Sequence, residues 1–441
     1  MGGLKSKTRS ILPKGIATFG PVTSAQKRGI ERELLSVFSQ WGYQEVIPPI
    51  FEYLDVMAEG LDEEMINRGY KVVDRGSGRL LLLRPDVTPQ IARMVAALMR
   101  DQPLPLRLCY SVNVFRDEEE HAGRERELFQ IGGELIGWDA PQADAEVIAI
   151  AIEALRHLGL RSFKLAIGQV EFFRGFLDGL GLSAQIQKKI RNAVTRKESS
   201  ELKEIIIRAK IPSKVAGKIL AVPELFGQEE VLKAAGRLVN GRTTERSLAR
   251  LEEVYRLLVS SGYRDHLLID LGEIRGFDYY TGIVFEVFAK GLGYAVGGGG
   301  RYDRMLGKFG YDCPSTGFAF DLVRLYHALN QVEKRTSHEA LGFLIASSSS
   351  QSVKAFRLAK VLREKGYRVA LRMWAGDLQD AIRYAQGIGM EKVLLLEDPE
   401  RASRGPASRE TVSDEVVMLD CRNGLRKRFK TKKLLSFVPG V

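Results

Sequence analysis

The chain has 441 residues, of which 45% are hydrophobic and 27% are charged, so it is long enough for two or three domains with substantial cores. It has no uninterrupted apolar run of about 18 residues and no apolar leader at its start, so we expect a cytoplasmic protein with no membrane partner. The formal net charge is +11, but seven cationic residues crowd into residues 422–433, where a solvated or frayed tail is a simpler interpretation than an RNA-binding surface.

The first part of the chain predicts a helix followed by a sheet. Apolar residues at helical spacing predict a helix over 24–40, which passes through Gly42 into a strand-like segment at 44–53. Alternating segments then predict a broad antiparallel sheet, with strands at 71–74, 79–85, 106–116 and 127–137. An amphipathic helix is predicted at 144–159.

The middle of the chain changes in character. Residues 183–262 are rich in Lys, Glu, Leu and Ile at spacings of three and four, which predicts a helical insert. The sheet is expected to resume over 265–290 and to end with a helix at 321–331. The core therefore comprises residues 1–182 and 263–330, and a polar linker follows at 331–340.

The last hundred residues alternate strands with helices. Strands are predicted at 341–347, 367–373 and 392–398, and helices at 351–366 and 377–389. Such alternation indicates a small α/β domain at 341–441 with a largely parallel sheet. Cys109, Cys313 and Cys421 lie far apart in the sequence and predict neither a disulfide framework nor a metal site.

Three stretches carry polar groups that suit a small polar ligand. The stretch "LLLRPDVT" places Arg84, Asp86 and Thr88 at alternate positions of a strand, so their side chains are expected to face the same way. In "VFRDEEEHAGRERELFQIGGELIG", two strands joined by a charged loop are expected to present Arg116 beside Gln130 and Glu134.

The third stretch, "RGFDYYTG", supplies Arg275, Tyr279 and Tyr280, and the glycines at 297–300 permit close approach of a ligand or a neighbouring strand. Each group also has a purely structural interpretation. Arg275 and Asp278 would form an ion pair, the tyrosines would belong to the core, and "DEEEH" would be a solvated turn.

The order of these motifs, with "GGGGRYD" and "TGFAFDLVRL", resembles the histidyl-tRNA synthetase family of class II synthetases over about residues 10 to 330. The resemblance is strongest to the non-charging branch of that family, the ATP phosphoribosyltransferase regulatory subunits. Residues 341–441 resemble the synthetase anticodon-binding domain more loosely. The implied fold is α+β, a class II synthetase-like antiparallel sheet flanked by helices, with a helical insert and a small C-terminal α/β domain.

The resemblance implies a site for free histidine and no cofactor or metal. Asp86, Thr88 and Gln130 match groups that hold the α-amino group, and Glu134 and Tyr280 match those that grip the imidazole. Arg275 matches an arginine near the carboxylate. Arg116 and Tyr279 complete the predicted histidine-binding set.

Departures from the synthetase pattern predict that the nucleotide part of the site is lost. Acidic residues at 117–120 and His121 replace a pattern that includes a cation, and Asp321 and Val323 replace a glycine and a glutamate, although Arg324 is kept. Carboxylates there would repel ATP. We therefore interpret the pocket as one that retains amino-acid recognition and lacks adenylation.

The resemblance then implies a non-catalytic subunit that activates the short catalytic subunit of ATP phosphoribosyltransferase, in a hetero-oligomer, and conveys feedback inhibition by histidine. It also implies a homodimer through residues 26–53, and we do not expect tRNA as a partner. Two alternatives remain open. One is a charging histidyl-tRNA synthetase, favoured by Arg116, Arg275, Arg324 and the C-terminal domain. The other is a synthetase-like protein acting on another RNA or as a sensor.

Overall fold

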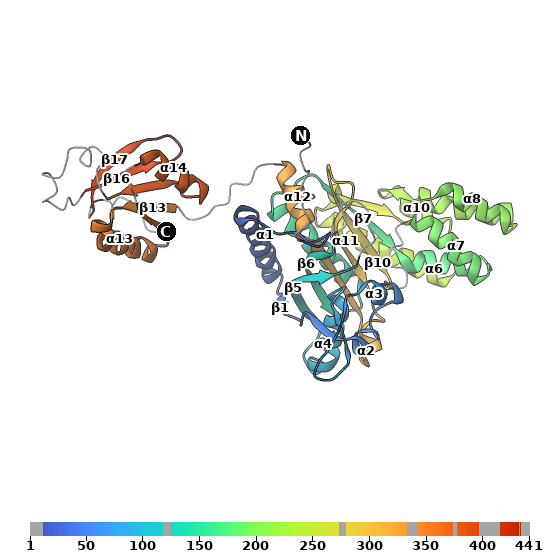
Figure 1. Cartoon of the computed structure of the whole chain (residues 1–441). Coiled ribbons are helices and arrows are strands. Elements are labelled where there is room, and N and C mark those ends of the chain that lie inside the picture. Colours follow the sequence, from blue (N-terminus) through green and yellow to red (C-terminus); the bar gives the residue numbers. More distant parts are fainter. Residues whose placement is uncertain are drawn as a thin grey trace, which may run out of the picture. The chain divides into compact units, whose positions relative to one another are not determined.

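The computed structural model describes residues 12–117, 125–272, 279–332, 342–373, 377–396, 415–431 and 433. The chain forms two compact units, residues 1–335 and 336–441 (Figure 1). Each unit has its own sheet and its own buried apolar cluster.

A large mixed sheet forms the centre of the first unit. Within the described residues it has nine strands, in the order β1-β5-β6-β12-β11-β10-β7-β9-β8. Their bounds are β1 (Gln44–Glu45), β5 (Leu106–Phe115), β6 (Glu127–Ile136), β7 (Phe163–Gln169), β8 (Phe226–Gly227), β9 (Leu267–Asp270), β10 (Ile283–Ala289), β11 (Ala295–Arg301) and β12 (Ser315–Asp321). The pairs β1–β5 and β7–β9 are parallel and the other neighbours are antiparallel. The prediction of an antiparallel-type sheet flanked by helices is confirmed.

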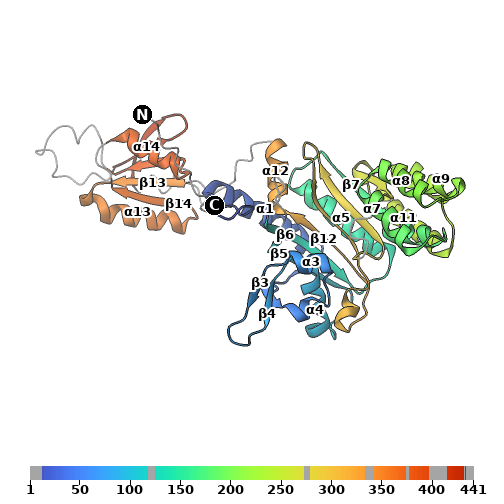
Figure 2. The ribbon, with the colours of Figure 1, turned by 45° about the vertical axis from the view of Figure 1, so that its right-hand side comes forward.

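Apolar residues of this sheet pack against helices on one face. Ile131 and Leu135 of β6, and Leu165 and Ile167 of β7, belong to the same buried cluster as the helices α1 (Pro21–Gln40), α5 (Pro141–His157), α11 (Arg242–Ser260) and α12 (Leu322–Val332). Residues at alternate strand positions point to opposite faces, so Gln130 and Glu134 face away from these helices. Figure 2 shows α5 lying along the sheet.

A second, smaller sheet corrects one prediction. Within the described chain β2 (Phe51–Tyr53), β4 (Leu80–Leu83) and β3 (Lys71–Val73) form a separate three-stranded antiparallel sheet, in the order β2-β4-β3. The predicted strand at 44–53 is divided between the two sheets because Pro48 and Pro49 lack the N–H groups that a strand ladder needs. The short helices α2 (Leu54–Met57) and α3 (Glu63–Arg68), and α4 (Thr88–Leu98), lie in the same part of the chain.

Helices gather beside β7, at one end of the large sheet (Figures 1 and 2). Their bounds are α6 (Val170–Asp178), α7 (Ala184–Thr195), α8 (Ser199–Arg208), α9 (Ser213–Ala221) and α10 (Glu230–Gly236). Their inward apolar residues, such as Ile190, Leu202 and Ile219, are buried in the main cluster. The described helices include none that is both long enough and apolar enough to cross a membrane.

The second unit contains a five-stranded sheet in its described residues, in the order β14-β13-β15-β16-β17. The elements are β13 (Gly342–Ser347), α13 (Ser352–Glu364), β14 (Arg368–Met373), α14 (Leu378–Gly387), β15 (Lys392–Leu395), β16 (Glu415–Asp420) and β17 (Arg426–Lys430). The parallel pairing of β13 with β14 and β15 confirms the predicted α/β pattern. The basic tail was predicted as a solvated or frayed end. Most side chains of Arg426–Lys430 are exposed, as a solvated segment requires, but the segment is not frayed, because it pairs with β16 as a strand.

Candidate functional site

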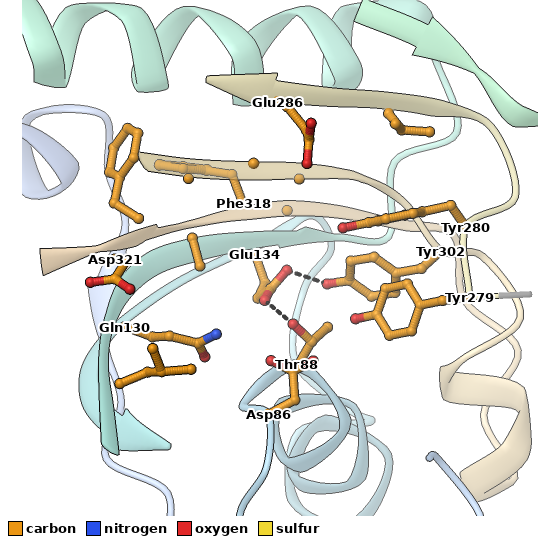
Figure 3. A pocket seen from close by; sticks show the side chains of 18 of the residues that line it. Asp86, Thr88, Gln130, Glu134, Tyr279, Tyr280, Glu286, Tyr302, Phe318 and Asp321 are labelled. Carbon is orange, nitrogen blue, oxygen red and sulfur yellow. Dashed lines mark hydrogen bonds between the residues drawn. The ribbon is translucent and has the colours of Figure 1, made fainter. Parts of the chain in front are cut away.

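A cavity of about 410 Å³ opens on the sheet face that points away from α5. Strands β5, β6, β10, β11 and β12 supply its floor, and α4 and the segments around residues 60 and 280 supply its walls. The polar side chains that line it are Asp62, Asp86, Thr88, Tyr110, Arg116, Gln130, Glu134, Tyr279, Tyr280, Glu286, Tyr302, Asp321 and Arg324. Figure 3 shows a tyrosine group on one side of Glu134, and Gln130 and Asp321 on the other.

One end of the cavity offers hydrogen-bond acceptors. Asp86 lies just before α4, and the side chain of Gln130 hydrogen-bonds to it. The Gln130 Oε1 atom is buried and has no hydrogen-bond partner in the described part of the chain. A buried acceptor of this kind, beside a carboxyl group, suits an ammonium donor from a ligand.

Arg116 brings a positive charge close to Asp86 at this end of the cavity. Its Nε atom donates to the Pro85 carbonyl at 2.7 Å, and its Nη2 atom lies 3.7 Å from Asp86 Oδ1. Burial raises the pKa of the Asp86 carboxyl, and Arg116 opposes that rise. The Arg116 guanidinium therefore helps to keep Asp86 ionised and retains donors for a ligand carboxylate.

Glu134 lies at the centre of the cavity and is almost fully buried. The hydroxyl of Thr88 donates to Glu134 Oε1 at 2.8 Å and that of Tyr110 donates to the same atom at 3.1 Å, while the Tyr302 hydroxyl donates to Oε2. Burial raises the pKa of this carboxyl to about 8, although these hydrogen bonds oppose the rise. A group held in this way is ready to exchange a proton or a hydrogen bond with a ring nitrogen of a ligand.

The sheet makes room for Glu134 through a glycine. A Cβ atom added at Gly317 of the neighbouring strand β12 would lie 1.6 Å from Glu134 Oε2. Gly317 pairs with Glu134 in the antiparallel register of β12 and β6. Any larger residue at 317 would therefore displace the carboxyl from the cavity.

Tyrosine rings form the wall next to Glu134 (Figure 3). The Tyr279 ring meets that of Tyr280 edge to face, with centroids 4.8 Å apart, and lies 5.7 Å from that of Tyr302. Burial raises the pKa of each of these phenols, so they remain neutral hydrogen-bonding groups. The wall is thus aromatic and carries hydroxyl groups, which suits a planar ring with polar atoms.

Beside Gln130, on the side of Glu134 away from the tyrosine wall, the cavity also holds Asp321 and Arg324 at the start of α12. Asp321 accepts hydrogen bonds from the Val323 and Arg324 amides, at 3.0 Å and 3.1 Å, and so caps α12. Its Oδ2 atom also lies 3.1 Å from Arg324 Nε. The Asp321 carboxylate is therefore paired with the Arg324 guanidinium, which would otherwise be free to bind an anion in the cavity.

The structure places Asp86, Thr88, Arg116, Gln130, Glu134, Tyr279 and Tyr280 around this one cavity. Arg275 was also predicted here, but it lies outside the described residues, as do Asp278 and residues 118–121 of the acidic loop.

One local prediction is wrong, that Arg84 faces the same way as Asp86 and Thr88. Arg84 does not face the cavity, because β4 ends at Leu83 and the Arg84 guanidinium donates to the Asn113, Pro48 and Pro49 carbonyls. Arg116 does lie at the cavity with Gln130 and Glu134, as predicted, although it stands just beyond the end of β5 and not within the strand.

Sequence reasoning missed Tyr110 and Tyr302, which complete the shell around Glu134. Tyr302 stands within the quoted "GGGGRYD" motif, and Tyr110 is on the strand paired with β6, at the same face as Leu108. A search for donors that a buried carboxyl requires would have pointed to tyrosines on neighbouring strands.

Comparisons with known proteins agree with this fold. The model of the family described as histidyl-tRNA synthetase matches residues 15–325. The ATP phosphoribosyltransferase regulatory subunit of Syntrophotalea carbinolica is 38% identical over 413 residues, which cover 93% of this chain and 96% of that protein. The protein of the same name from Geobacter sulfurreducens is 37% identical, over 96% of this chain and 95% of the relative.

Solved structures give the same result. An "ATP phosphoribosyltransferase regulatory subunit/histidyl-tRNA synthetase" from Bacillus halodurans superposes with a TM-score of 0.77 and 30% identity, covering 87% of this chain and 97% of that one. A histidyl-tRNA synthetase from a Nostoc species has a TM-score of 0.79 at 20% identity, over 98% and 99% of the two chains, which supports the fold alone.

The fold and the family match place the chain among the histidyl-tRNA synthetase-like proteins of class II. Within that class it belongs to the family of ATP phosphoribosyltransferase regulatory subunits, as its relatives at 37% and 38% identity show. The predicted resemblance is therefore confirmed, and so is the prediction that the chain is a regulatory and not a catalytic subunit.

Proposed function

We propose that this chain assembles with the catalytic subunit of ATP phosphoribosyltransferase, activates it, and conveys feedback inhibition by free histidine bound around Glu134. The observation that carries the histidine part is the order of groups along the cavity. Acceptors at Asp86 and Gln130 suit an ammonium, Arg116 suits a carboxylate, and Glu134 beside a tyrosine wall suits an imidazole. Free histidine combines an ammonium, a carboxylate and a planar ring with N–H groups, which these groups match in turn.

Binding in one subunit alters activity in another only if the assembly has states that differ in their affinity for histidine. The test is to express this chain with a short-form catalytic subunit from the same organism, purify the complex and assay phosphoribosyl transfer. We expect co-purification, higher activity than the catalytic subunit has alone, and inhibition by added histidine. A catalytic subunit that is fully active alone, or a complex indifferent to histidine, would contradict the proposal.

A histidyl-tRNA synthetase is the second candidate, because Arg116 and Arg324 both line the cavity. Histidine-dependent exchange of pyrophosphate into ATP distinguishes the two. Robust exchange by the purified chain would favour the synthetase.

We expect ATP to bind weakly, because Asp321 brings a negative charge to the cavity and engages Arg324. Asp321→Asn removes the charge but keeps an effective helix cap, so α12 should remain intact. The variant should bind ATP several-fold more tightly, in line with about 1 kcal/mol for a partly exposed charge pair. Calorimetric titration with ATP measures this. Equal ATP affinity of the variant and the wild type would show that Asp321 does not weaken ATP binding.

The proposal includes self-association of the chain through the region around residues 26–53. Ile47, Ile50 and Phe51 are apolar and exposed there, with 83% of Ile47 accessible. Ile47→Asp should lower the molar mass measured by light scattering from that of a dimer to that of a monomer, because a charge would be buried in an apolar contact. Val353→Asp, at an exposed apolar residue of the other unit, is the matched control. A wild-type monomer at micromolar concentration would contradict the dimer.

A further inference from the structure

A second cavity, of about 880 Å³, lies at the other end of the same sheet face and shares no lining residue with the first. Its strand residues are Lys164 and Ala166 of β7, Leu268 and Asp270 of β9, and Phe288 of β10. On β10, Phe288 follows Val284 and Glu286 at alternate positions, and these two line the first cavity. The two cavities therefore open on one face.

Positive charge dominates the lining of this second cavity. Arg161, Lys164, Lys197 and Lys290 face two acids, Asp265 and Asp270, which leaves an excess of two positive charges. Burial lowers the pKa of the remaining titratable group, His266, so the imidazole adds no charge at neutral pH.

Internal partners account for the Asp270 carboxylate and for two of the cations. Asp270 is almost fully buried and accepts from Lys197 Nζ at 2.9 Å and from the Gly272 amide at 2.9 Å. Lys164 Nζ donates to the Asp265 carbonyl at 2.6 Å. Neither Arg161 nor Lys290 forms an ion pair within the parts of the chain that the structure describes. These two cations are available to an anion.

Lys197 is held at the cavity in an unusual conformation. It follows the end of α7 with a φ of 54°, in the left-handed region where a glycine is the common residue at the end of a helix. Its amide still donates to the Val194 carbonyl at 2.9 Å, as in a helix terminus. The left-handed conformation is unfavourable for a lysine. Its presence here therefore indicates that the ion pair of the Lys197 side chain with the buried Asp270 carboxylate has a role.

The rest of the lining is apolar and aromatic. The Phe163 ring stacks on the His266 imidazole, with centroids 4.1 Å apart and planes at 10°. Phe288, Ala166 and Leu268 add apolar surface. Phe226, on the edge strand β8, also lines the cavity and is 54% exposed, so its ring is accessible to a ligand.

We propose that this second cavity binds an organic phosphate monoester that carries a planar ring, of the class of a nucleoside monophosphate. The phosphate group, with close to two negative charges, matches the excess of positive charge and would lie against Arg161 and Lys290. The ring would lie against Phe226 and Phe288, as planar groups do on aromatic side chains. The volume falls within the roughly 300–1,000 Å³ range of small-molecule sites.

The test is calorimetric titration of the full chain with adenosine monophosphate, and with inorganic phosphate and adenosine as its two halves. We expect the monophosphate to bind more tightly than either half. The double variant Arg161→Ala, Lys290→Ala should weaken its binding at least tenfold, and Phe226→Ala should weaken the monophosphate and adenosine but not phosphate. All three side chains are exposed, so the variants are expected to fold, which circular dichroism verifies.

Two controls locate the binding. Lys308→Ala removes an exposed lysine that lies outside both cavities and should leave the affinity unchanged. Glu134→Ala alters the first cavity and should also leave it unchanged. Loss of monophosphate binding in Glu134→Ala, full binding in the double variant, or no binding of the monophosphate at millimolar concentration would overturn the proposal.

Discussion

Replacing Glu134 by alanine is expected to weaken the binding of free histidine by roughly 30-fold to several thousand-fold, which corresponds to about 2–5 kcal/mol for losing a desolvated carboxyl partner that ionises against the bound cation. Glu134 is the acceptor that faces the tyrosine wall, and its carboxyl is buried among the Thr88, Tyr110 and Tyr302 hydroxyls. Glu134→Gln keeps one oxygen acceptor but carries no charge, so its affinity should lie between those of the wild type and Glu134→Ala. Calorimetric titration with histidine measures all three affinities.

A matched control for this prediction is Glu153→Gln. The Glu153 carboxylate on α5 also accepts from two side chains, Trp41 and Tyr263, but it does not line the cavity. That variant should bind histidine as the wild type does. Equal histidine affinity in wild type and Glu134→Ala would place the histidine site elsewhere.

Without histidine, the Glu134 carboxyl should make the protein less stable as the pH rises from about 5 to 8. Burial raises its pKa to about 8 in the folded chain, whereas an unfolded glutamate titrates near its ordinary value of 4.5. Between these values the folded state retains a proton that the unfolded state has released, so the free energy of unfolding falls with rising pH. The full loss is about 5 kcal/mol, and it is complete above the folded pKa.

Glu134→Gln provides the comparison, because its amide does not titrate. Urea unfolding of both proteins at pH 5, 6, 7 and 8 should give a free energy that falls more steeply for the wild type, by several kcal/mol over the range. The Glu153→Gln variant should follow the wild-type slope. Parallel curves for wild type and Glu134→Gln would show that Glu134 ionises near its ordinary pH.

The local sequence pattern was sufficient to predict the main elements that carry the first cavity. Alternation in "ELFQIGGELIG" predicted strand β6, and the period of two then placed Gln130 and Glu134 on one face and Ile131 and Leu135 on the other. The amphipathic pattern at 144–159 likewise predicted α5. These predictions succeed because side-chain direction along a strand or helix follows from the backbone period alone.

Predictions failed where contacts with a distant part of the chain determine the local structure. Arg84 continues the alternation of its strand, yet the strand ends one residue earlier and carbonyls of residues 48, 49 and 113 take its guanidinium. The basic residues of β17 look like a frayed tail, yet they pair with the edge of β16 as a strand. The local sequence does not show whether a strand edge or a carbonyl group elsewhere in the chain is available as a partner.

The sequence by itself determined the family, several of the strands and helices of each unit, and most of the polar residues that surround the first cavity. The tertiary structure alone decided that Tyr110 and Tyr302 would donate to Glu134, and that Gly317 would leave space for its carboxyl. It also decided that Arg324 would be engaged by Asp321 and that cations from separate elements would meet around the second cavity. The physical reason is that a pKa, a cavity or an ion pair depends on distances across strands that are remote in sequence, whereas a strand or helix depends on neighbours along the chain.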